Sequence, residues 1–182
     1  MIPDTSDKDG HSLRMLLYVA IKQFPPEVAY DFLLDKDRLV GAMAANYLMG
    51  ERSLAERTFK YAVELAGGKN AWHRELAAFI LGQLCAPDNP YKDRSVPILE
   101  SLARDSEPAV RGAAIVALGH LQSEASKELV LAALNDPDPG VVECASYALW
   151  AIGRTKADQE KLHAAVNRFD EKTRKTIDVW ED

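Results

Sequence analysis

The chain has 182 residues, of which 47% are hydrophobic and 27% are charged. This balance predicts a soluble protein with an ordered core. Its formal net charge of −6 argues against a general nucleic-acid binder, because such proteins usually present a concentrated basic face. The N-terminus lacks the charged and then apolar pattern of a secretory signal, and no apolar run approaches the roughly 20 residues that span a bilayer. We therefore expect a cytoplasmic protein that binds neither nucleic acid nor membrane.

Apolar residues recur at spacings of three and four along almost the whole chain, which predicts helices and no strand. A first amphipathic helix is expected over 12–24, where Pro25 and Pro26 end it, because proline lacks the amide proton that a helix needs. The second helix runs from these prolines to residue 34, and the third covers 39–50. Residues 1–25 then form an N-terminal capping helix.

The next helix is expected to open with a capping box, because Glu56 follows Ser53 at the required spacing. A glycine pair at 67–68 ends it, and a partner helix covers 71–85. After a break at 86–91 come two compact hairpins that end at residue 153. Residues 154–182 are expected to form a C-terminal cap, whose apolar residues are Ile177, Val179 and Trp180.

An internal repeat is the strongest signal in the sequence. The stretch RDSEPAVRGAAIVALGHLQ, from Arg104, is partly repeated 31 residues later as NDPDPGVVECASYALWAIG, from Asn135. Moving back from the first of these stretches by 37 residues, and then by another 33, reveals two more units that match less well. Four units therefore fill 26–153, and the match is best over 92–153. Periods of this length are typical of helix pairs that stack into a solenoid.

The repeated polar residues have an expected structural role. Asp105 and Asp136 stand just before helix N-termini, where a carboxylate caps exposed amides. Arg74 and Arg111 are expected to bond the aspartates and carbonyls of neighbouring turns as a structural ladder. That ladder should stop in the fourth unit, where Val142 stands in place of the arginine.

The stretch DSEPAVRGAAIVALGHL, residues 105–121, resembles the HEAT repeat, particularly the short HEAT-like form of phycobilisome lyases. The resemblance is clear over 92–153 and degenerate over 26–85. It implies an all-α fold, a right-handed α-solenoid of stacked antiparallel helix pairs in one domain over 1–182. It further implies that the second helix of each pair lines a concave face that holds other proteins.

The repeat alignment separates packing positions from spare ones on the second helices. If 110, 113, 114, 117, 118 and 121 face inward, then 112, 116 and 119 face outward. The predicted partner-binding residues are the counterparts of this stripe in the four units: Asn46, Phe79, Val116, Glu143, Tyr147, Trp150 and Arg154. The alternative is that the C-terminal segment covers Tyr147 and Trp150 as part of the cap.

Catalytic and metal-binding patterns are missing. None of the four histidines precedes a glutamate, so the His-Glu pairs that hold iron in HEAT-like hydroxylases are absent, and we expect no metal or cofactor. Cys85 and Cys144 are expected to be small buried hydrophobes in a reducing compartment. HEAT-like DNA glycosylases use a basic face, which this acidic chain does not offer.

The sequence therefore predicts a non-enzymatic module that binds a protein partner on the face of its second helices. One specific form is an acidic inhibitor or immunity protein that neutralises a basic partner. The alternative is an enzyme or ligand-handling protein of the HEAT-like lyase type, with a small molecule held against Glu143, Tyr147 and Trp150. A third possibility, nucleic-acid binding, predicts an affinity that falls steeply with salt.

Overall fold

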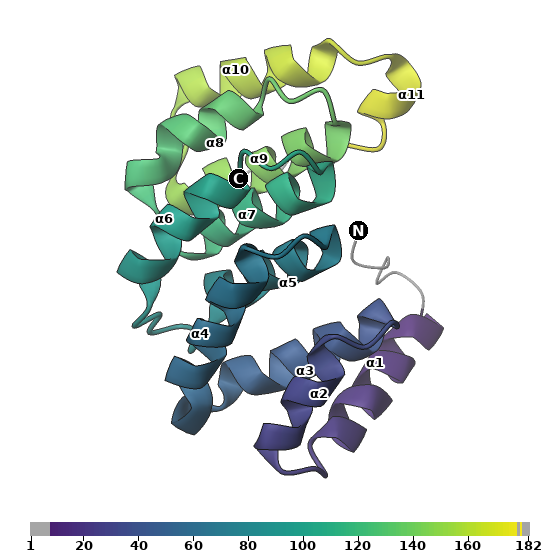
Figure 1. The fold of residues 1–182 in the computed structure, drawn as a ribbon. Helices are drawn as coiled ribbons and strands as arrows, with labels where there is room; N and C mark the ends of the chain where they lie inside the picture. Colours follow the sequence, from purple (N-terminus) through teal and green to yellow (C-terminus); the bar gives the residue numbers. More distant parts are fainter. Residues whose placement is uncertain (1–7, 178, 180–182) are drawn as a thin grey trace.

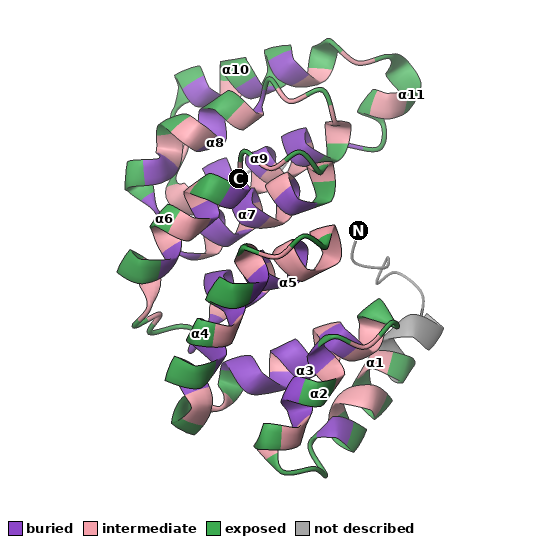
Figure 2. Cartoon of the chain, viewed as in Figure 1, coloured by how far each residue is buried: buried purple, intermediate pink, exposed green. Residues whose placement is uncertain are grey.

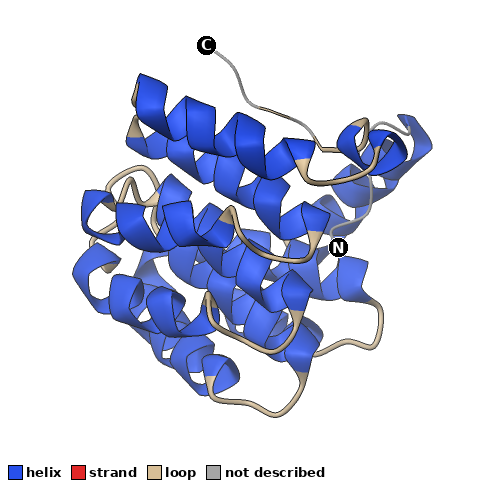
Figure 3. Ribbon diagram, turned by 90° about the horizontal axis from the view of Figure 1, so that it is seen from above, coloured by secondary structure: helices blue, strands red, loops and turns tan. Residues whose placement is uncertain are grey.

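The computed structural model describes residues 8–177 and residue 179, with side chains from Leu13 onward, and all regular structure in these residues is helical (Figure 3). The α-helices, in chain order, are α1 (Lys8–Ile21), α2 (Ala29–Leu33), α3 (Arg38–Gly50), α4 (Ala55–Ala66), α5 (Ala71–Gln83), α6 (Lys92–Leu102), α7 (Pro108–His120), α8 (Lys127–Ala133), α9 (Pro139–Ile152), α10 (Lys156–Asn167) and α11 (Glu171–Arg174). Three short 3-10 helices precede α2, α4 and α8. The prediction of an all-α chain is confirmed.

The helices pack as consecutive pairs that follow one another in chain order, from α1 at the bottom of Figure 1 to α10 and α11 at the top. The pairs are α2 with α3, α4 with α5, α6 with α7, and α8 with α9, while α1 packs against α3. The second helices α5, α7 and α9 also contact one another directly, and α10 contacts α9. This is the stacked arrangement of a solenoid.

Two hydrophobic clusters fill the space between the helices and meet along α7. The larger extends from Ile21 to Leu121, and the smaller from Ile115 to Ala165. Figure 2 shows buried residues along the helices, interspersed with intermediate and exposed ones. Val110 and Leu118 face the larger cluster, whereas Ile115 faces the smaller one, so α7 contributes to both. Neither the first nor the last pair has a complete core of its own.

Glycine and alanine set the close approach of the second helices. A Cβ added at Gly82 would lie 2.6 Å from the Cβ of Ala117, and one added at Gly119 would lie 2.8 Å from the Cα of Ala148. Real Cβ atoms essentially never lie within 3.0 Å of such a neighbour, so a side chain at either position would force the helices apart. The repeated small residues are therefore packing residues.

The sequence misplaced several helix starts. The first helix begins at Lys8 and ends at Ile21, earlier at both ends than predicted. The predicted capping box at Ser53 is wrong, because Ser53 lies in a 3-10 turn and the N-cap of α4, Leu54, makes no side-chain capping bond. A capping box does open α10, where Thr155 Oγ1 accepts from the amide of Asp158 and a carboxylate oxygen of Asp158 accepts from the amide of Thr155.

The repeated aspartates are also not the caps that the sequence predicted. The N-cap residues of α7 and α9 are Glu107 and Asp138. Asp105 and Asp136 lie two residues earlier, where each accepts a hydrogen bond from the amide of the N-cap residue, at 3.0 and 2.9 Å. Their carboxylates therefore shape the turn before the helix and leave the helix amides to other groups.

The C-terminal segment returns to the smaller cluster. Ile177 is buried, and Val179 packs against that cluster. Trp180, the third apolar residue expected in the cap, lies outside the described residues. Among the described helices, none combines the length and the apolar character that crossing a membrane requires.

Candidate protein-binding surface

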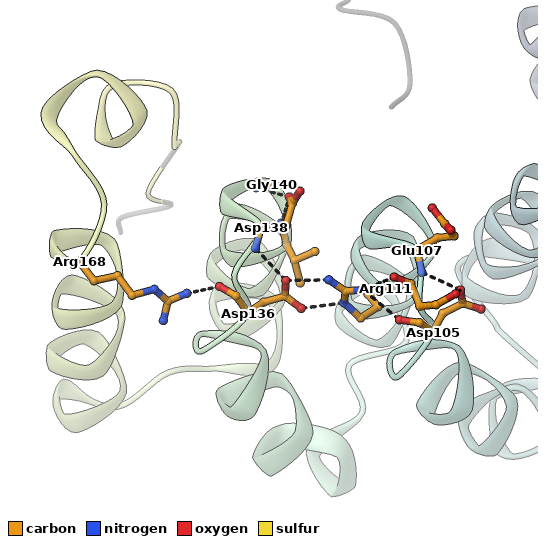
Figure 4. A network of polar contacts seen from close by, with 9 residues as sticks. Asp105, Glu107, Arg111, Asp136, Asp138, Gly140 and Arg168 are labelled. Carbon is orange, nitrogen blue, oxygen red and sulfur yellow. Dashed lines mark hydrogen bonds and ion pairs between the residues drawn. The ribbon is translucent and has the colours of Figure 1, made fainter.

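The second helices α5 and α7 each carry one arginine that bonds to the turn before the next second helix, as the sequence predicted. Figure 4 shows the second of these two links. Arg74 on α5 donates to both carboxylate oxygens of Asp105, at 2.6 and 2.8 Å. Arg111 on α7 does the same to Asp136, at 2.7 and 2.9 Å. These bidentate contacts, here called the arginine ladder, fix the spacing between successive repeats because a planar fork meets a planar carboxylate in one geometry.

The third nitrogen of each ladder arginine binds backbone. The Nη1 atom of Arg74 donates to the carbonyls of Gly68 and Lys69, at 3.1 and 3.0 Å. That of Arg111 donates to the carbonyls of Asp105 and Ser106, both at 2.9 Å. Each arginine thus connects the turn of its own repeat to the aspartate of the next one.

The ladder keeps its aspartates ionised. For Asp105 the hydrogen bonds from Arg74 are the main reason that its pKa lies below the ordinary range, although burial acts in the opposite direction. For Asp136 burial is the larger single effect and raises the pKa, but Arg111 and the amide of Asp138 together outweigh it and leave the pKa lowered. Both carboxylates therefore carry their charge at neutral pH.

Among the described residues the arginine ladder stops at the fourth unit, where the sequence predicted its end. Val142 is fully buried at the arginine position of α9. Arg168, which follows α10, instead donates to the carbonyl of Leu134 at 2.5 Å and to the carbonyl of Asp136 (Figure 4). A cation from the C-terminal segment thus serves the last turn. Because this residue lies beyond the last repeat, the repeat alignment had no position that could reveal it.

The predicted outward stripe is only partly correct. Gly112 and Gly119 are buried, and a Cβ at Gly112 would meet the Sγ of Cys144 at 3.1 Å. The counterparts Glu75, Gly82 and Met49 are buried as well. These positions face the neighbouring second helix, which is why the repeat keeps small residues there. The prediction that they face outward is wrong because the second helices contact one another directly at these positions.

The middle column of that stripe does reach the surface. It consists of one half-buried side chain from each of the four second helices, here called the second-helix face: Asn46, Phe79, Val116 and Tyr147. Asn46 turns its amide back onto its own helix, where Nδ2 donates to the carbonyl of Ala42 at 3.1 Å. The other three members present apolar or aromatic groups at equivalent helix positions in successive repeats.

An aromatic group extends the second-helix face at its C-terminal end. The rings of His120 and Tyr147 meet edge to face with centroids 5.4 Å apart, and those of Tyr147 and Trp150 lie 6.0 Å apart. Burial lowers the pKa of His120, so its ring is neutral at pH 7. Sequence reasoning missed His120, although it follows Val116 by four residues and so lies on the same side of α7.

Trp150 and Glu143 lie on the side of α9 that corresponds to the α9-facing side of α7. In the repeat alignment they correspond to Gly119 and Gly112 of α7. Those two glycines touch α9. Trp150 is 42% exposed, so the C-terminal segment does not bury it fully, and Glu143 is half-buried. Arg154, the last predicted binding residue, follows α9 and is half-buried.

The cysteines fit the structural role that the sequence assigned. Cys85 is buried and unpaired, and Cys144 packs against Gly112 of the neighbouring helix. Burial, together with the carboxylates of Glu143 and Asp138, raises the pKa of Cys144 to about 12, so it is a thiol at neutral pH. Within the described part of the chain, no group of three or more histidine, cysteine, aspartate or glutamate residues could hold a metal ion.

The comparisons with known proteins agree with this architecture. A family model of HEAT repeats matches residues 59–150 and 95–177. The X-ray structure of YibA from Escherichia coli is similar over 96% of this chain and 74% of its own, with a TM-score of 0.58 and 17% sequence identity, a likeness that concerns the fold alone. No curated protein matches the sequence. Because the two matched ranges together extend from residue 59 to 177, more than half of its length, the chain belongs to the HEAT-repeat family.

Proposed function

We propose that this chain is a non-enzymatic module that binds a protein partner through the second-helix face. The observation that carries the proposal is the row formed by Phe79, Val116 and Tyr147, which lie half-buried at one position in three successive second helices. HEAT repeats are typically protein-interaction modules, and such a row suits an extended contact. In this proposal residues 1–182 act as one domain, with 1–25 and 154–182 as its caps.

The rigidity of this surface supports the proposal. Gly82 and Gly119 hold α5, α7 and α9 in direct contact, and the arginine ladder fixes the turns at one end of these helices. A partner therefore meets side chains whose relative positions are set before binding, which lowers the entropy cost of association. The aromatic group of His120, Tyr147 and Trp150 adds the residue types that most often anchor an interface.

The net charge of the chain favours one class of protein partner. The chain carries a formal net charge of −6, which favours association with a basic protein. We therefore specify the proposal as an acidic inhibitor or immunity protein that occupies a basic partner. Cys85 and Cys144 are both unpaired, which fits the reducing, cytoplasmic compartment that the sequence predicted.

Two depressions on the described surface lie away from the residues that the lyase-type alternative needs. A small molecule held against Glu143, Tyr147 and Trp150 would need a depression beside them. Two surface depressions among the described residues, of about 360 and 310 Å³, lie between α4 and α6 and between α8 and α10. None of the three side chains lines either one.

The test is affinity capture from a lysate of the source cells with three forms of the chain. The wild type should retain a stoichiometric, basic partner, and Val116→Asp should lose it because a carboxylate then stands in the centre of the row. The matched control is Val63→Asp, since Val63 lies on the outer helix α4 and is 38% exposed. That variant should retain the partner.

Binding of the purified partner should weaken as salt is raised, because opposite net charges speed the encounter of the two proteins. The same partner held equally well by Val116→Asp would contradict the proposal. So would equal loss from both variants, provided that circular dichroism shows both to be folded. Failure of the wild type to retain any stoichiometric protein would also count against it.

A further inference from the structure

The outward side of α1 is apolar although nothing in the described chain covers it. Between Leu13 and Ile21 only Arg14 is charged, so this part of the helix is apolar nearly all round. Ile21 faces the core, whereas the side chains of Leu13, Met15, Leu16 and Val19 are 50%, 51%, 68% and 50% exposed. Those four residues are here called the α1 outer face. A helix that is apolar on every side is normally buried on every side.

The size of this face is that of an interface. Four large side chains that are each at least half exposed present on the order of 400 Å² of apolar surface, which is as large as the biggest patch on a typical monomer. Two such faces brought together would bury about 800 Å², somewhat less than the roughly 1,000 Å² of a stable interface, so the contact is expected to be weak and reversible. Partner residues at the rim would add to it.

The opposite end of the solenoid is unsuited to cover this face. The exposed residues of α10 are mainly charged or polar, among them Lys156, Glu160 and Lys161. Head-to-tail stacking would desolvate these charges against apolar side chains without pairing them, which is unfavourable. A fibre of stacked copies is therefore excluded on chemical grounds.

The surface that best matches the α1 outer face is the same face of another copy. Six of the eight large hydrophobic side chains that are exposed in the described residues lie between Leu13 and Leu34, and the other two, Val63 and Trp150, lie on different helices. The chain thus has one concentrated apolar end. Contact between two identical patches closes on itself and leaves neither exposed.

We propose that two copies of this chain associate through their α1 outer faces, with the two helices antiparallel about a twofold axis. Antiparallel packing opposes the two helix dipoles. The second-helix face, on α3, α5, α7 and α9, is not used in this contact.

The experiment measures the mass of the full-length chain by sedimentation equilibrium over a wide range of concentrations. The wild type should pass from monomer to dimer as the concentration rises. Leu16→Glu should raise the dimer dissociation constant by about tenfold or more, because it buries a carboxylate in the apolar contact. Leu16 is the most exposed member of the face, so the substitution should leave the fold of the monomer unchanged.

The matched control is Val63→Glu, which places the same charge on another exposed apolar residue outside the face. It should dimerise like the wild type. Val19→Lys is a second variant of the face, of opposite charge, and should dissociate as Leu16→Glu does. The proposal is overturned by a wild type that stays monomeric throughout, or by a dimer that tolerates both substitutions in α1. A monomer that instead sediments with anionic lipid vesicles would assign the face to a membrane surface and overturn it as well.

Discussion

Arg74 and Arg111 each satisfy a set of acceptors that would otherwise be costly to bury. Every ladder arginine donates to two carboxylate oxygens and two backbone carbonyls, and the arginine and aspartate side chains are largely shielded from water. A lysine could not make these contacts, because its ammonium has no planar fork. At the scale of single residues, the repeat is therefore held together by arginine geometry as much as by apolar packing.

Replacing Arg111 by methionine should lower the free energy of unfolding by about 2–4 kcal/mol, because the carboxylate of Asp136 stays shielded without its partner. Urea denaturation followed by circular dichroism measures this change. The matched control is Lys175→Met, which removes an ion pair with Glu171 in which both side chains are largely exposed. That change should stay within about 0.5 kcal/mol. Equal effects of the two substitutions would show that the ladder adds nothing beyond a surface ion pair.

Asp158 should make stability depend on pH in the acid range. Burial opposes its charged form, but the hydrogen bonds from Thr155 and Lys127 outweigh burial and lower its pKa to about 2. A carboxyl whose pKa is depressed in the folded state stabilises the fold above its unfolded pKa of about 4, and the effect disappears as pH falls toward 2. The shift of nearly two units corresponds to about 2 kcal/mol at neutral pH.

Urea denaturation of the wild type and of Asp158→Asn at several pH values tests this. The wild type should be more stable by about 2 kcal/mol at pH 6, and the difference should shrink to almost nothing near pH 2. A difference that is independent of pH would mean that Asp158 acts through the shape of its capping contacts alone. In that case the charge would have no part in the stability of α10.

At the scale of helices, the second helices approach one another at glycine. Gly82→Ala should destabilise the chain by roughly 1–3 kcal/mol, because its new Cβ would lie 2.6 Å from the Cβ of Ala117 and the helices must move apart. Gly50→Ala is the control, since a Cβ there would have nothing within 4 Å. It should be neutral or stabilising by up to about 1 kcal/mol. Thermal unfolding of both variants distinguishes a packing role for Gly82 from a general effect of helix propensity.

The helices themselves could be predicted from the sequence, because their apolar spacing and the repeat both depend on local pattern. The arginine ladder could be predicted for the same reason, since Arg74 aligns with Arg111 and Asp105 aligns with Asp136 in the repeat. The caps at Ser53 and Asp105 were misassigned because a turn residue and an N-cap residue have the same chemistry. Only the backbone path decides which of the two amides a carboxylate meets.

The candidate site was harder to predict than the fold. The sequence predicts that Gly112 and Gly119 face outward, because helix periodicity gives the direction of a side chain but not the distance to the next helix. The structure places Trp150 and Glu143 on one side of α9 and not in a groove. Val116 and Tyr147 reach the surface, as the sequence predicted. The role of Arg168 could not be predicted from the repeat alignment, because Arg168 belongs to no repeat.

At the scale of the whole molecule, the joint between the first two repeats is built differently from the others. Gly41 and Gly68 stand where the ladder would need an arginine and an aspartate. A Cβ at Gly41 would lie 2.8 Å from the carbonyl oxygen of Leu33, so no arginine fits there. Arg38 bridges this joint instead: it stacks on Trp72 at 4.9 Å and lies 3.6 Å from Glu75. Because the guanidinium of Arg38 is about half exposed, this link is weaker than the buried ladder.

The α1–α3 unit should therefore open more readily than the stack from α5 to α9. Hydrogen exchange followed by mass spectrometry should give the amides of α3 an opening free energy at least about 1 kcal/mol below that of α7 amides, which the ladder holds on both sides. The Leu16→Glu background at low concentration prevents any protection from self-association. In that background Arg38→Ala should speed exchange in α3 and leave α9 unchanged, whereas Arg111→Met should speed exchange in α7 and α9. Equal protection of α3 and α7 would show that the missing ladder contact is replaced in full, and that the solenoid unfolds as one cooperative unit from its first repeat to its last.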